Sequence, residues 1–296
     1  MLEDHAVCAF RTLGKRVLHL APEEEPDEEL SPLERGQLLH KCLERFFVRL
    51  GSARGLSGSA ADFELLRVAV DETLEDWARE HHVGHPGLWE LRKTDVHRTL
   101  AAVVDAESEH GPRPLAIEAR FGFEGGWDPL RLRDGDDEVC VRGAIDRVDR
   151  TPDGVLVLDY KSSRPDTLKL KLRALLDTEF QLPLYAAVLR QRGEAHVDAS
   201  YVSLGVAKRS DRLSKFAGGS LDALLELDPA RRAALRAQVP PPPNLADKVF
   251  EKVREMRAGT FEVRPTSCEF CELRPACRLV ALPTDPDENA GEQSRA

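Results

Sequence analysis

The stretch Gly143-Ala144-Ile145-Asp146-Arg147-Val148-Asp149, followed by the turn Pro152-Asp153-Gly154 and by Val155-Leu156-Val157-Leu158-Asp159-Tyr160-Lys161, decides the fold of this chain. Apolar and β-branched residues on both sides of a turn signal predict two antiparallel strands. Because side chains alternate along a strand, Asp159 and Lys161 share one face. Pairing across the turn brings Asp146 close to Asp159. A two-residue turn places them directly opposite, whereas a bulge at Gly154 shifts the register by one.

Two neighbouring carboxylates and a lysine suit metal-dependent hydrolysis of a phosphodiester. The carboxylates of Asp146 and Asp159 repel each other unless a cation lies between them. Mg²⁺ and Mn²⁺ take oxygen ligands, activate water and stabilise charge on a phosphate. Lys161 would orient or deprotonate that water, or neutralise the developing charge. The alternative is a surface hairpin with a chance Asp-x-Lys sequence.

These motifs resemble the core of the PD-(D/E)XK nuclease superfamily, in its RecB-like branch. That branch includes the nuclease domains of RecB and AddB and the CRISPR-associated exonucleases that trim spacer DNA. The resemblance covers residues 8–47, 115–190 and 245–280. It implies an α/β fold with a restriction-endonuclease-like core, in which helices flank a mixed β-sheet.

Three further segments extend the resemblance and suggest site residues. The segment Leu33-Glu34-Arg35-Gly36-x-x-Leu39-His40-x-x-Leu43-x-x-Phe46 resembles the helix that carries a metal-binding histidine, His40. Glu118 falls where the family often has an acidic residue before the core hairpin. The segment Gln181-Leu182-Pro183-Leu184-Tyr185 resembles the motif on the helix after the Asp-x-Lys strand.

The resemblance thus implies roles for seven side chains. His40, Glu118, Asp146 and Asp159 would bind the metal, with Asp146, Asp159 and Lys161 as catalytic residues. Gln181 would hold the site or the nucleic acid, and Tyr185 would contact backbone or base. Each of the added residues has a simpler interpretation: His40 as a packed core residue, Glu118 as an exposed strand residue, and Tyr185 as half-buried.

Six cysteines suggest a metal cluster. The spacing Cys268-x2-Cys271-x5-Cys277 supplies three thiolates, and a closed tetrahedral or cubane site needs a fourth. Cys8-Ala9-Phe10-Arg11 resembles the N-terminal cysteine motif of AddB and the spacer-trimming exonucleases, although the family usually has proline where Ala9 stands. The resemblance implies a [4Fe-4S] cluster that ties the two ends of the fold together. Zinc is the alternative. Cys42 and Cys140 are expected to be free, buried thiols.

The order of segments favours one domain. Residues 1–282 are expected to form a single RecB-like nuclease domain, with a helical insertion at 48–112, a C-terminal helix and cysteine segment at 245–280, and a disordered tail at 283–296. Residues 61–82, 87–109, 220–238 and 245–257 are expected to be helical, and 139–148 and 195–204 to be strands.

Composition bears on partners and compartment. The net charge of −10 does not favour broad duplex binding. Basic residues near the site and beside Cys8 could instead line a channel for a single strand; they are Arg11, Lys15, Arg16, Lys161, Arg164, Lys169, Lys171 and Arg173. No secretory signal or membrane-spanning stretch is visible, so a cytoplasmic, reducing location is expected.

The sequence therefore predicts a Mg- or Mn-dependent DNA exonuclease that acts on single-stranded ends in repair or recombination. Because the chain has no Gly-x-x-x-x-Gly-Lys-Ser/Thr loop, any helicase motor would belong to a partner chain or to another part of a longer protein. The alternative is a non-catalytic module of the same fold that binds DNA or a helicase.

Overall fold

The computed structural model describes residues 1–21, 30–217, 221–268 and 271–277, which divide into two compact units. The larger unit spans Pro26–Lys248, and the smaller combines Met1–Glu25 with Val249–Ala296. The expectation that residues 1–282 form one domain stays a prediction, and the tail at 283–296 lies outside the described residues.

A five-stranded mixed sheet forms the centre of the larger unit, with strand order β1-β4-β5-β6-β7. Its strands are β1 Arg113–Phe121, β4 Gly143–Thr151, β5 Gly154–Lys161, β6 Val197–Ser203 and β7 Lys208–Arg209. All neighbours are antiparallel except β5 and β6, which are parallel and are joined through a helical crossover. The predicted α/β class with a mixed sheet is confirmed.

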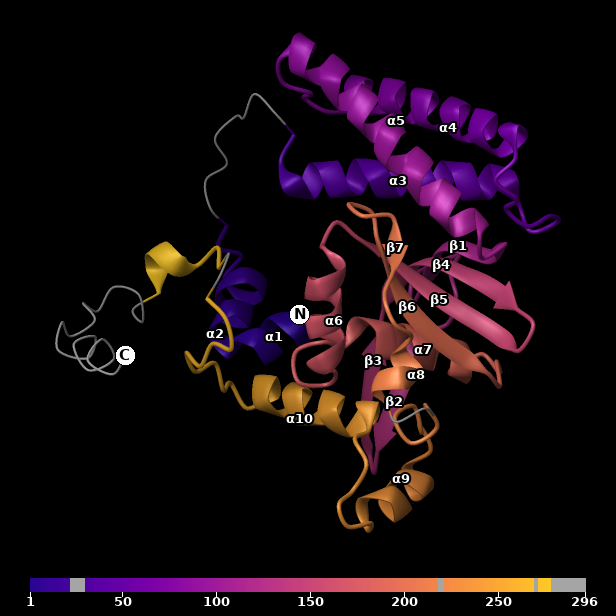
Figure 1. Cartoon of the computed structure of the whole chain (residues 1–296). Coiled ribbons are helices and arrows are strands. Elements are labelled where there is room, and N and C mark those ends of the chain that lie inside the picture. The colour runs from indigo at the N-terminus through magenta and orange to yellow at the C-terminus, as the bar shows by residue number, and fades with distance from the viewer. Residues whose placement is uncertain (22–29, 218–220, 269–270, 278–296) are drawn as a thin grey trace, which may run out of the picture. The chain divides into compact units, whose positions relative to one another are not determined.

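Three long helices cover one face of this sheet (Figure 1). They are α3 Pro32–Leu50, α4 Ala60–Glu80 and α5 Pro86–Ser108. Their apolar residues form a continuous core with Leu156, Leu158 and Tyr160 of β5. Ser31 begins α3 with a capping box, in which its hydroxyl accepts from Glu34 N–H while the Glu34 carboxylate accepts from Ser31 N–H. The helices expected at 61–82 and 87–109 correspond to α4 and α5.

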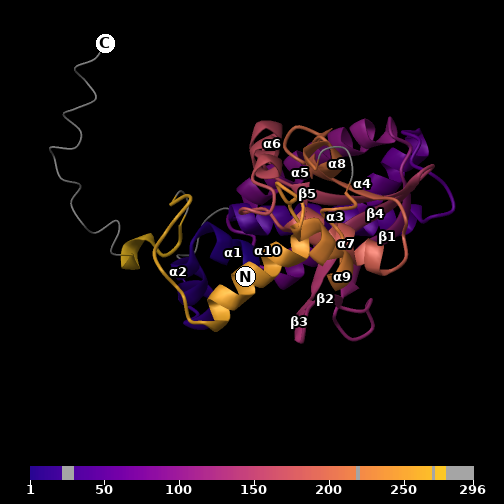
Figure 2. The same ribbon diagram turned by 90° about the horizontal axis from the view of Figure 1, so that it is seen from below.

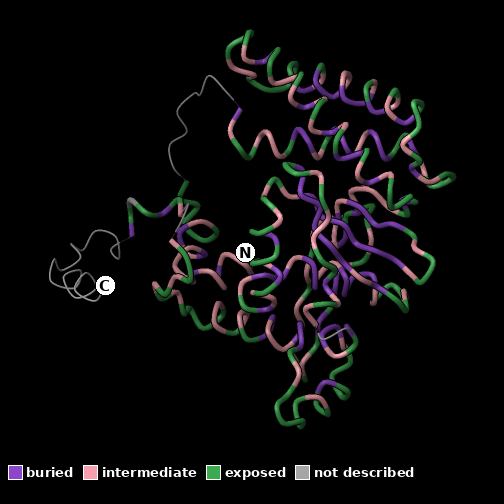
Figure 3. The backbone as a smooth tube through the Cα atoms, in the orientation of Figure 1, coloured by how far each residue is buried: buried purple, intermediate pink, exposed green. Residues whose placement is uncertain are grey.

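The shorter helices include the crossover between β5 and β6. They are α6 Pro165–Arg173, α7 Gln181–Gln191, α8 Leu213–Phe216 and α9 Pro229–Arg236. Helix α7 packs on β5 and β6. Alternation along β5 directs Asp159 away from the face that carries Leu158, and Asp159 bonds to α7, so α7 covers the opposite face. The strands between these layers are largely buried (Figure 3).

Two expectations about single elements are wrong. Residues 139–148 do not form one strand, because the chain changes sheets at Arg142. The preceding strand, β3 Asp137–Val141, pairs with β2 Leu130–Asp134 in a separate ribbon that extends away from α3–α5 (Figures 1 and 2). Cys140 is consequently exposed, whereas Cys42 is buried as expected.

The helix expected at 220–238 is shorter than predicted. Helix α9 begins only at Pro229, because Asp228 caps it by accepting a hydrogen bond from Arg231 N–H. The strand expected at 195–204 is β6. The helix expected at 245–257 is α10, Leu245–Arg257. None of the described helices has the length and apolarity needed to cross a bilayer.

The smaller unit is built from the two ends of the chain. It contains α1 Leu2–Val7, α2 Ala9–Thr12, a π-helical turn at Leu13–Val17, most of α10, and a 3₁₀ turn at Arg274–Ala276. Buried His5 bonds to the Glu255 carboxylate of α10 through its Nε2 at 3.1 Å. Residues from the N-terminus and the C-terminal region are therefore packed side by side in this unit.

Candidate active site

The hairpin β4–β5 places the two predicted aspartates opposite each other. Arg147 pairs with Leu158 and Thr151 pairs with Gly154, so the turn contains only Pro152 and Asp153 and no bulge shifts the register. That register places Asp146 opposite Asp159. Beyond the last pair, the N–H of Tyr160 donates a 2.7 Å hydrogen bond to Asp146 Oδ2. The ladder thus ends where the carboxylates begin, which leaves them open to other partners.

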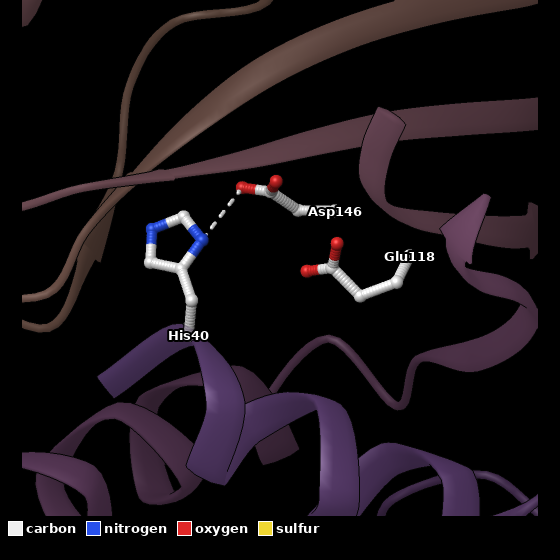
Figure 4. Close-up of side chains that lie close together, drawn as sticks. All are labelled: His40, Glu118 and Asp146. Atoms are coloured by element: carbon white, nitrogen blue, oxygen red, sulfur yellow. Dashed lines mark ion pairs between the residues drawn. The ribbon is translucent and has the colours of Figure 1, made fainter. Parts of the chain in front are cut away.

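His40, Glu118 and Asp146 converge from three different elements (Figure 4). Helix α3 carries His40, β1 carries Glu118 and β4 carries Asp146, and one ligand atom from each lies within 4.8 Å of the others. His40 Nδ1 is 3.5 Å from Asp146 Oδ2. The His40 ring also meets the Tyr160 ring edge-on, with centroids 5.5 Å apart, and this contact fixes the imidazole above β5.

Glu118 reaches this group through an unusual backbone conformation. Its φ of 46° is left-handed, which costs a residue with a side chain about 1–3 kcal/mol. The residues on either side remain in the sheet, since Ile117 pairs with Arg147 and Ala119 with Ile145. The conformation is therefore confined to the one residue whose carboxylate faces Asp146.

The electrostatics of the site show an excess of negative charge. Burial raises the pKa of Glu118 to about 7, and the nearby Asp146 carboxylate adds to the rise. Burial also raises the pKa of Asp146 and of Asp159. Burial lowers the pKa of His40, which keeps the imidazole neutral and its lone pairs available. Carboxylates in this state gain most from a bound cation.

Asp159 belongs to an adjoining row of hydrogen bonds and lies outside the three-residue group. Its Oδ2 is 2.7 Å from Lys161 Nζ, and its Oδ1 accepts a 2.7 Å hydrogen bond from Gln181 Nε2. Gln181 Oε1 in turn accepts from Lys161 Nζ at 2.7 Å, and Gln181 Nε2 is 3.0 Å from the Tyr185 hydroxyl. Burial lowers the pKa of Lys161, but Asp159 more than offsets this effect and the pKa is raised. The ammonium therefore stays charged.

A divalent cation fits the donor set. One neutral imidazole nitrogen and two carboxylates are suitable ligands for Mn²⁺ and acceptable ones for Mg²⁺. The three side chains line an open cleft of about 500 Å³, shared with Lys41, Glu44 and Lys161. The cleft is open enough to admit water and a phosphodiester beside the ligands.

Two buried networks behind the site were not predicted from the sequence. Glu179 accepts from the Tyr201 hydroxyl, from Lys171 Nζ at 3.1 Å and from the backbone N–H of Gln181 at 3.2 Å. It thereby fixes the start of α7. No pattern in the sequence marks this residue, because its partners come from three separate elements.

The second network surrounds Arg147, which is fully buried. Its guanidinium pairs with Glu107 of α5, lies 3.1 Å from Asp149 Oδ1, and donates a 2.8 Å hydrogen bond to the Tyr160 hydroxyl. Arg209 of β7 pairs with Glu107 at 2.8 Å. This network connects α5 to the strand that carries Asp159 and Lys161. The motif Asp146-Arg147-Val148-Asp149 was the available signal, but it did not identify Glu107 or Arg209.

Part of the predicted basic channel is neutralised. Lys171 pairs with Glu179. In the smaller unit, Arg11 and Arg16 pair with Asp4, and Lys15 pairs with Glu272. Arg164, Lys169 and Arg173 lie on or beside α6, where Lys169 is exposed and the two arginines are half-buried.

The four predicted cluster cysteines all belong to the smaller unit. Cys8 and Cys277 are buried, and Cys268 and Cys271 are half-buried. Thr266 N–H donates to Val7 C=O at 2.9 Å, and Phe10 N–H donates to Glu262 C=O at 3.3 Å. These bonds hold the backbone on both sides of Cys8 beside the segment that leads into Cys268. The local chain arrangement thus suits a shared cluster.

Comparisons with known proteins agree with this geometry. A family model described as "PD-(D/E)XK nuclease superfamily" matches residues 1–278. One relative, a component of an ATP-dependent helicase/deoxyribonuclease from Moorella thermoacetica, is 28% identical over 93% of this chain and 29% of its own length. The protein of the same name from Geobacillus kaustophilus is 32% identical over 43% of this chain and 12% of its own length. The chain thus spans less than a third of these relatives. The family resemblance carried by residues 143–161 is confirmed.

Proposed function

Because this chain belongs to the PD-(D/E)XK nuclease superfamily, we propose that it is a divalent-metal-dependent DNA nuclease. The observation that carries the proposal is the convergence of His40, Glu118 and Asp146 within 4.8 Å of one another. Beside them stands a lysine that Asp159 and Gln181 hold in place. A binding module has no use for buried carboxylates that repel one another.

Each residue has a defined task in this proposal. His40, Glu118 and Asp146 would hold Mg²⁺ or Mn²⁺, with Asp159 completing the acidic wall. The bound cation supplies an activated water and stabilises negative charge on the phosphate. Lys161 keeps its proton and donates a hydrogen bond to a phosphate oxygen or to the water, because Asp159 holds it charged. Gln181 orients both charged side chains, and Tyr185 keeps the Gln181 amide in position.

Cleavage of end-labelled single-stranded DNA tests the proposal. The wild-type chain with Mn²⁺ or Mg²⁺ should cut the strand, while Asp146→Asn and Lys161→Met should be inactive but folded. Equal cleavage by Asp146→Asn and the wild type would remove the assignment. A wild-type chain that binds DNA but never cuts it would instead be the non-catalytic module of the same fold.

We also propose finer features of the reaction. The acidic net charge of the chain suits an exonuclease that takes single-stranded ends during repair or recombination better than one that holds a broad duplex. The relatives carry the name of an ATP-dependent helicase/deoxyribonuclease, which supports a role beside a helicase motor. Labelled circular and linear single strands distinguish the modes, since an exonuclease leaves the circle intact.

The cysteines form the second cofactor site in this proposal. Cys8, Cys268, Cys271 and Cys277 would hold a [4Fe-4S] cluster that ties the two chain ends together. One cysteine far from the other three fits poorly with structural zinc, which is usually held by two close pairs. Iron and acid-labile sulfide analysis of anaerobically purified protein tests this, and stoichiometric zinc without iron would contradict it.

A further inference from the structure

A group of arginines and aromatic rings lies beside the metal site and has no place in the reaction described above. The Arg120 guanidinium lies 4.7 Å from the centroid of the Phe123 ring, and that of Arg142 lies 5.3 Å from the same centroid. The Arg192 guanidinium lies 4.0 Å from the Trp127 centroid. All three arginines are exposed and both rings are half-buried. We call these five residues the arginine–aromatic surface.

The arginines differ from most basic residues of this acidic chain in lacking an acidic partner. Within the described part of the chain, no carboxylate pairs with Arg120, Arg142 or Arg192, whereas most other exposed arginines share an Asp or Glu. Two guanidinium groups against one Phe123 ring repel each other. An anionic ligand would relieve that repulsion. The planar groups stacked on rings leave their N–H edges free for phosphate oxygens.

The surface is held rigidly by the turn between β1 and β2. Trp127 N–H donates to Arg120 C=O and Gly122 N–H donates to Trp127 C=O, both at 2.8 Å. A Cβ at Gly126 would lie 2.5 Å from the Arg120 carbonyl oxygen, so the close return of the chain requires glycine there. Gln191 at the end of α7 bonds to Pro129 C=O at 2.9 Å, which keeps the neighbouring Arg192 over Trp127.

The same strands lead directly into the metal site. Arg120 follows Glu118 by two residues on β1, and Arg142 precedes Asp146 by four residues at the start of β4. At about 3.3 Å per residue, these backbone separations are roughly 7 and 13 Å, a reach of one to a few nucleotides. The Phe121 and Tyr185 rings, with centroids 6.1 Å apart, connect the turn to Gln181.

From this arrangement we propose that the arginine–aromatic surface binds the single-stranded nucleic acid beside the scissile bond. Arg120, Arg142 and Arg192 contact successive phosphates, and Phe123 and Trp127 offer ring edges against which bases stack. The inference depends on the proposed nuclease function, because it gives the surface the substrate of the neighbouring site. An acidic peptide is the competing ligand, and the experiment separates the two.

Binding measured without cleavage tests this proposal. Fluorescein-labelled oligo(dT) and oligo(rU) of about twelve nucleotides, a length within the usual site size of single-strand binders, are titrated with the full chain in EDTA by fluorescence anisotropy. Salt is varied across roughly 50–200 mM. The test variants are the double substitution Arg120→Gln with Arg142→Gln, and the single substitutions Arg192→Gln and Phe123→Leu. The matched control is Arg79→Gln with Arg98→Gln, which removes two exposed arginines from α4 and α5.

The double variant should bind at least about tenfold more weakly than the wild type, and its log–log salt slope should fall by about 1.4, or about 0.7 for each lost phosphate contact. The control should stay within about twofold of the wild type, and melting temperatures should show that every variant is folded. Tighter binding of oligo(dT) or of oligo(rU) identifies the natural strand as DNA or RNA, and either result supports the surface.

A double variant that matches the control in affinity and slope would overturn the proposal, as would a wild-type chain that binds neither oligonucleotide. Binding does not require an intact metal site. A chain that binds through this surface but never cleaves would therefore overturn only the proposed nuclease function. A chain that cleaves normally and binds normally without Arg120 and Arg142 would overturn only the present inference.

Discussion

Lys161 Nζ donates a 2.7 Å hydrogen bond to Gln181 Oε1, across the junction between β5 and α7. The same amide donates to Asp159 through its nitrogen, so one side chain fixes both partners of the Asp-x-Lys motif. A leucine at 181 has similar volume but cannot make either bond. Gln181→Leu should therefore lower the cleavage rate about tenfold to a hundredfold, while Mn²⁺ affinity measured by calorimetry changes less than about threefold. Equal losses in rate and metal affinity would show that Gln181 acts on the metal ligands instead.

Lys161 itself should matter more than its support. Lys161→Met keeps the length and apolar stem of the side chain but removes the charge that faces the phosphate. Loss of one such donor usually costs about 10²–10³ in rate, so cleavage should fall by at least about a hundredfold. Lys161→Arg is the control, because it keeps the charge and should retain part of the activity. A fully active Lys161→Met would mean that the lysine only neutralises Asp159.

Stability of the metal-free protein should depend on pH in a defined direction. Burial raises the pKa of Glu118 to about 7, above its value in an unfolded chain. The folded state therefore binds the extra proton more tightly, and its stability is fully present at low pH and is lost as pH rises toward about 7 and above. Bound Mn²⁺ removes this loss. The rise in melting temperature on adding Mn²⁺ should be larger at about pH 8 than at about pH 5, and Glu118→Gln should shrink the difference.

The cysteines offer a prediction with an internal control. If Cys8, Cys268, Cys271 and Cys277 hold a cluster, then Cys268→Ser should lose iron and lower the melting temperature. Cys140→Ser changes an exposed thiol on β3 and should leave both quantities unchanged. Iron content and visible absorbance of anaerobically purified proteins check this. Unchanged iron in Cys268→Ser would exclude that residue as a ligand.

The Arg147 network should contribute to stability far more than a surface pair does. Arg147→Leu leaves Glu107 and Asp149 buried with only Arg209 as a cation, and unpaired buried charges typically cost about 3–5 kcal/mol. Arg150→Leu on the same strand breaks an exposed pair with Glu194 and should change the free energy of unfolding by less than about 1 kcal/mol. Urea denaturation measures both. Equal effects of the two substitutions would contradict the role given to Arg147.

The hairpin could be predicted from the sequence because its signals are local. The turn residues Pro152 and Asp153 set the register, and the register alone places Asp146 opposite Asp159. Similarly, Ser31, Pro32 and Glu34 mark the start of the helix that carries His40. The break at Arg142 was not predictable in this way, since residues 139–148 read as one strand and only pairing with β2 and β1 divides them.

Partners that are distant in the sequence could not be predicted. Glu107 lies 40 residues before Arg147, and Arg209 lies 102 residues after Glu107, so no spacing rule connects them. Glu118 was placed by resemblance, but its left-handed backbone is a property of the packed sheet. Asp159 was expected among the metal ligands, and the structure instead directs its carboxylate to Lys161 and Gln181.

The most direct test of the metal site is an anomalous difference map from crystals soaked in Mn²⁺. A manganese peak in contact with His40, Glu118 and Asp146, and absent from crystals of Asp146→Asn, is the result expected. A manganese ion bound elsewhere, or full occupancy that survives Asp146→Asn, would contradict the assignment of these three side chains as a catalytic metal centre.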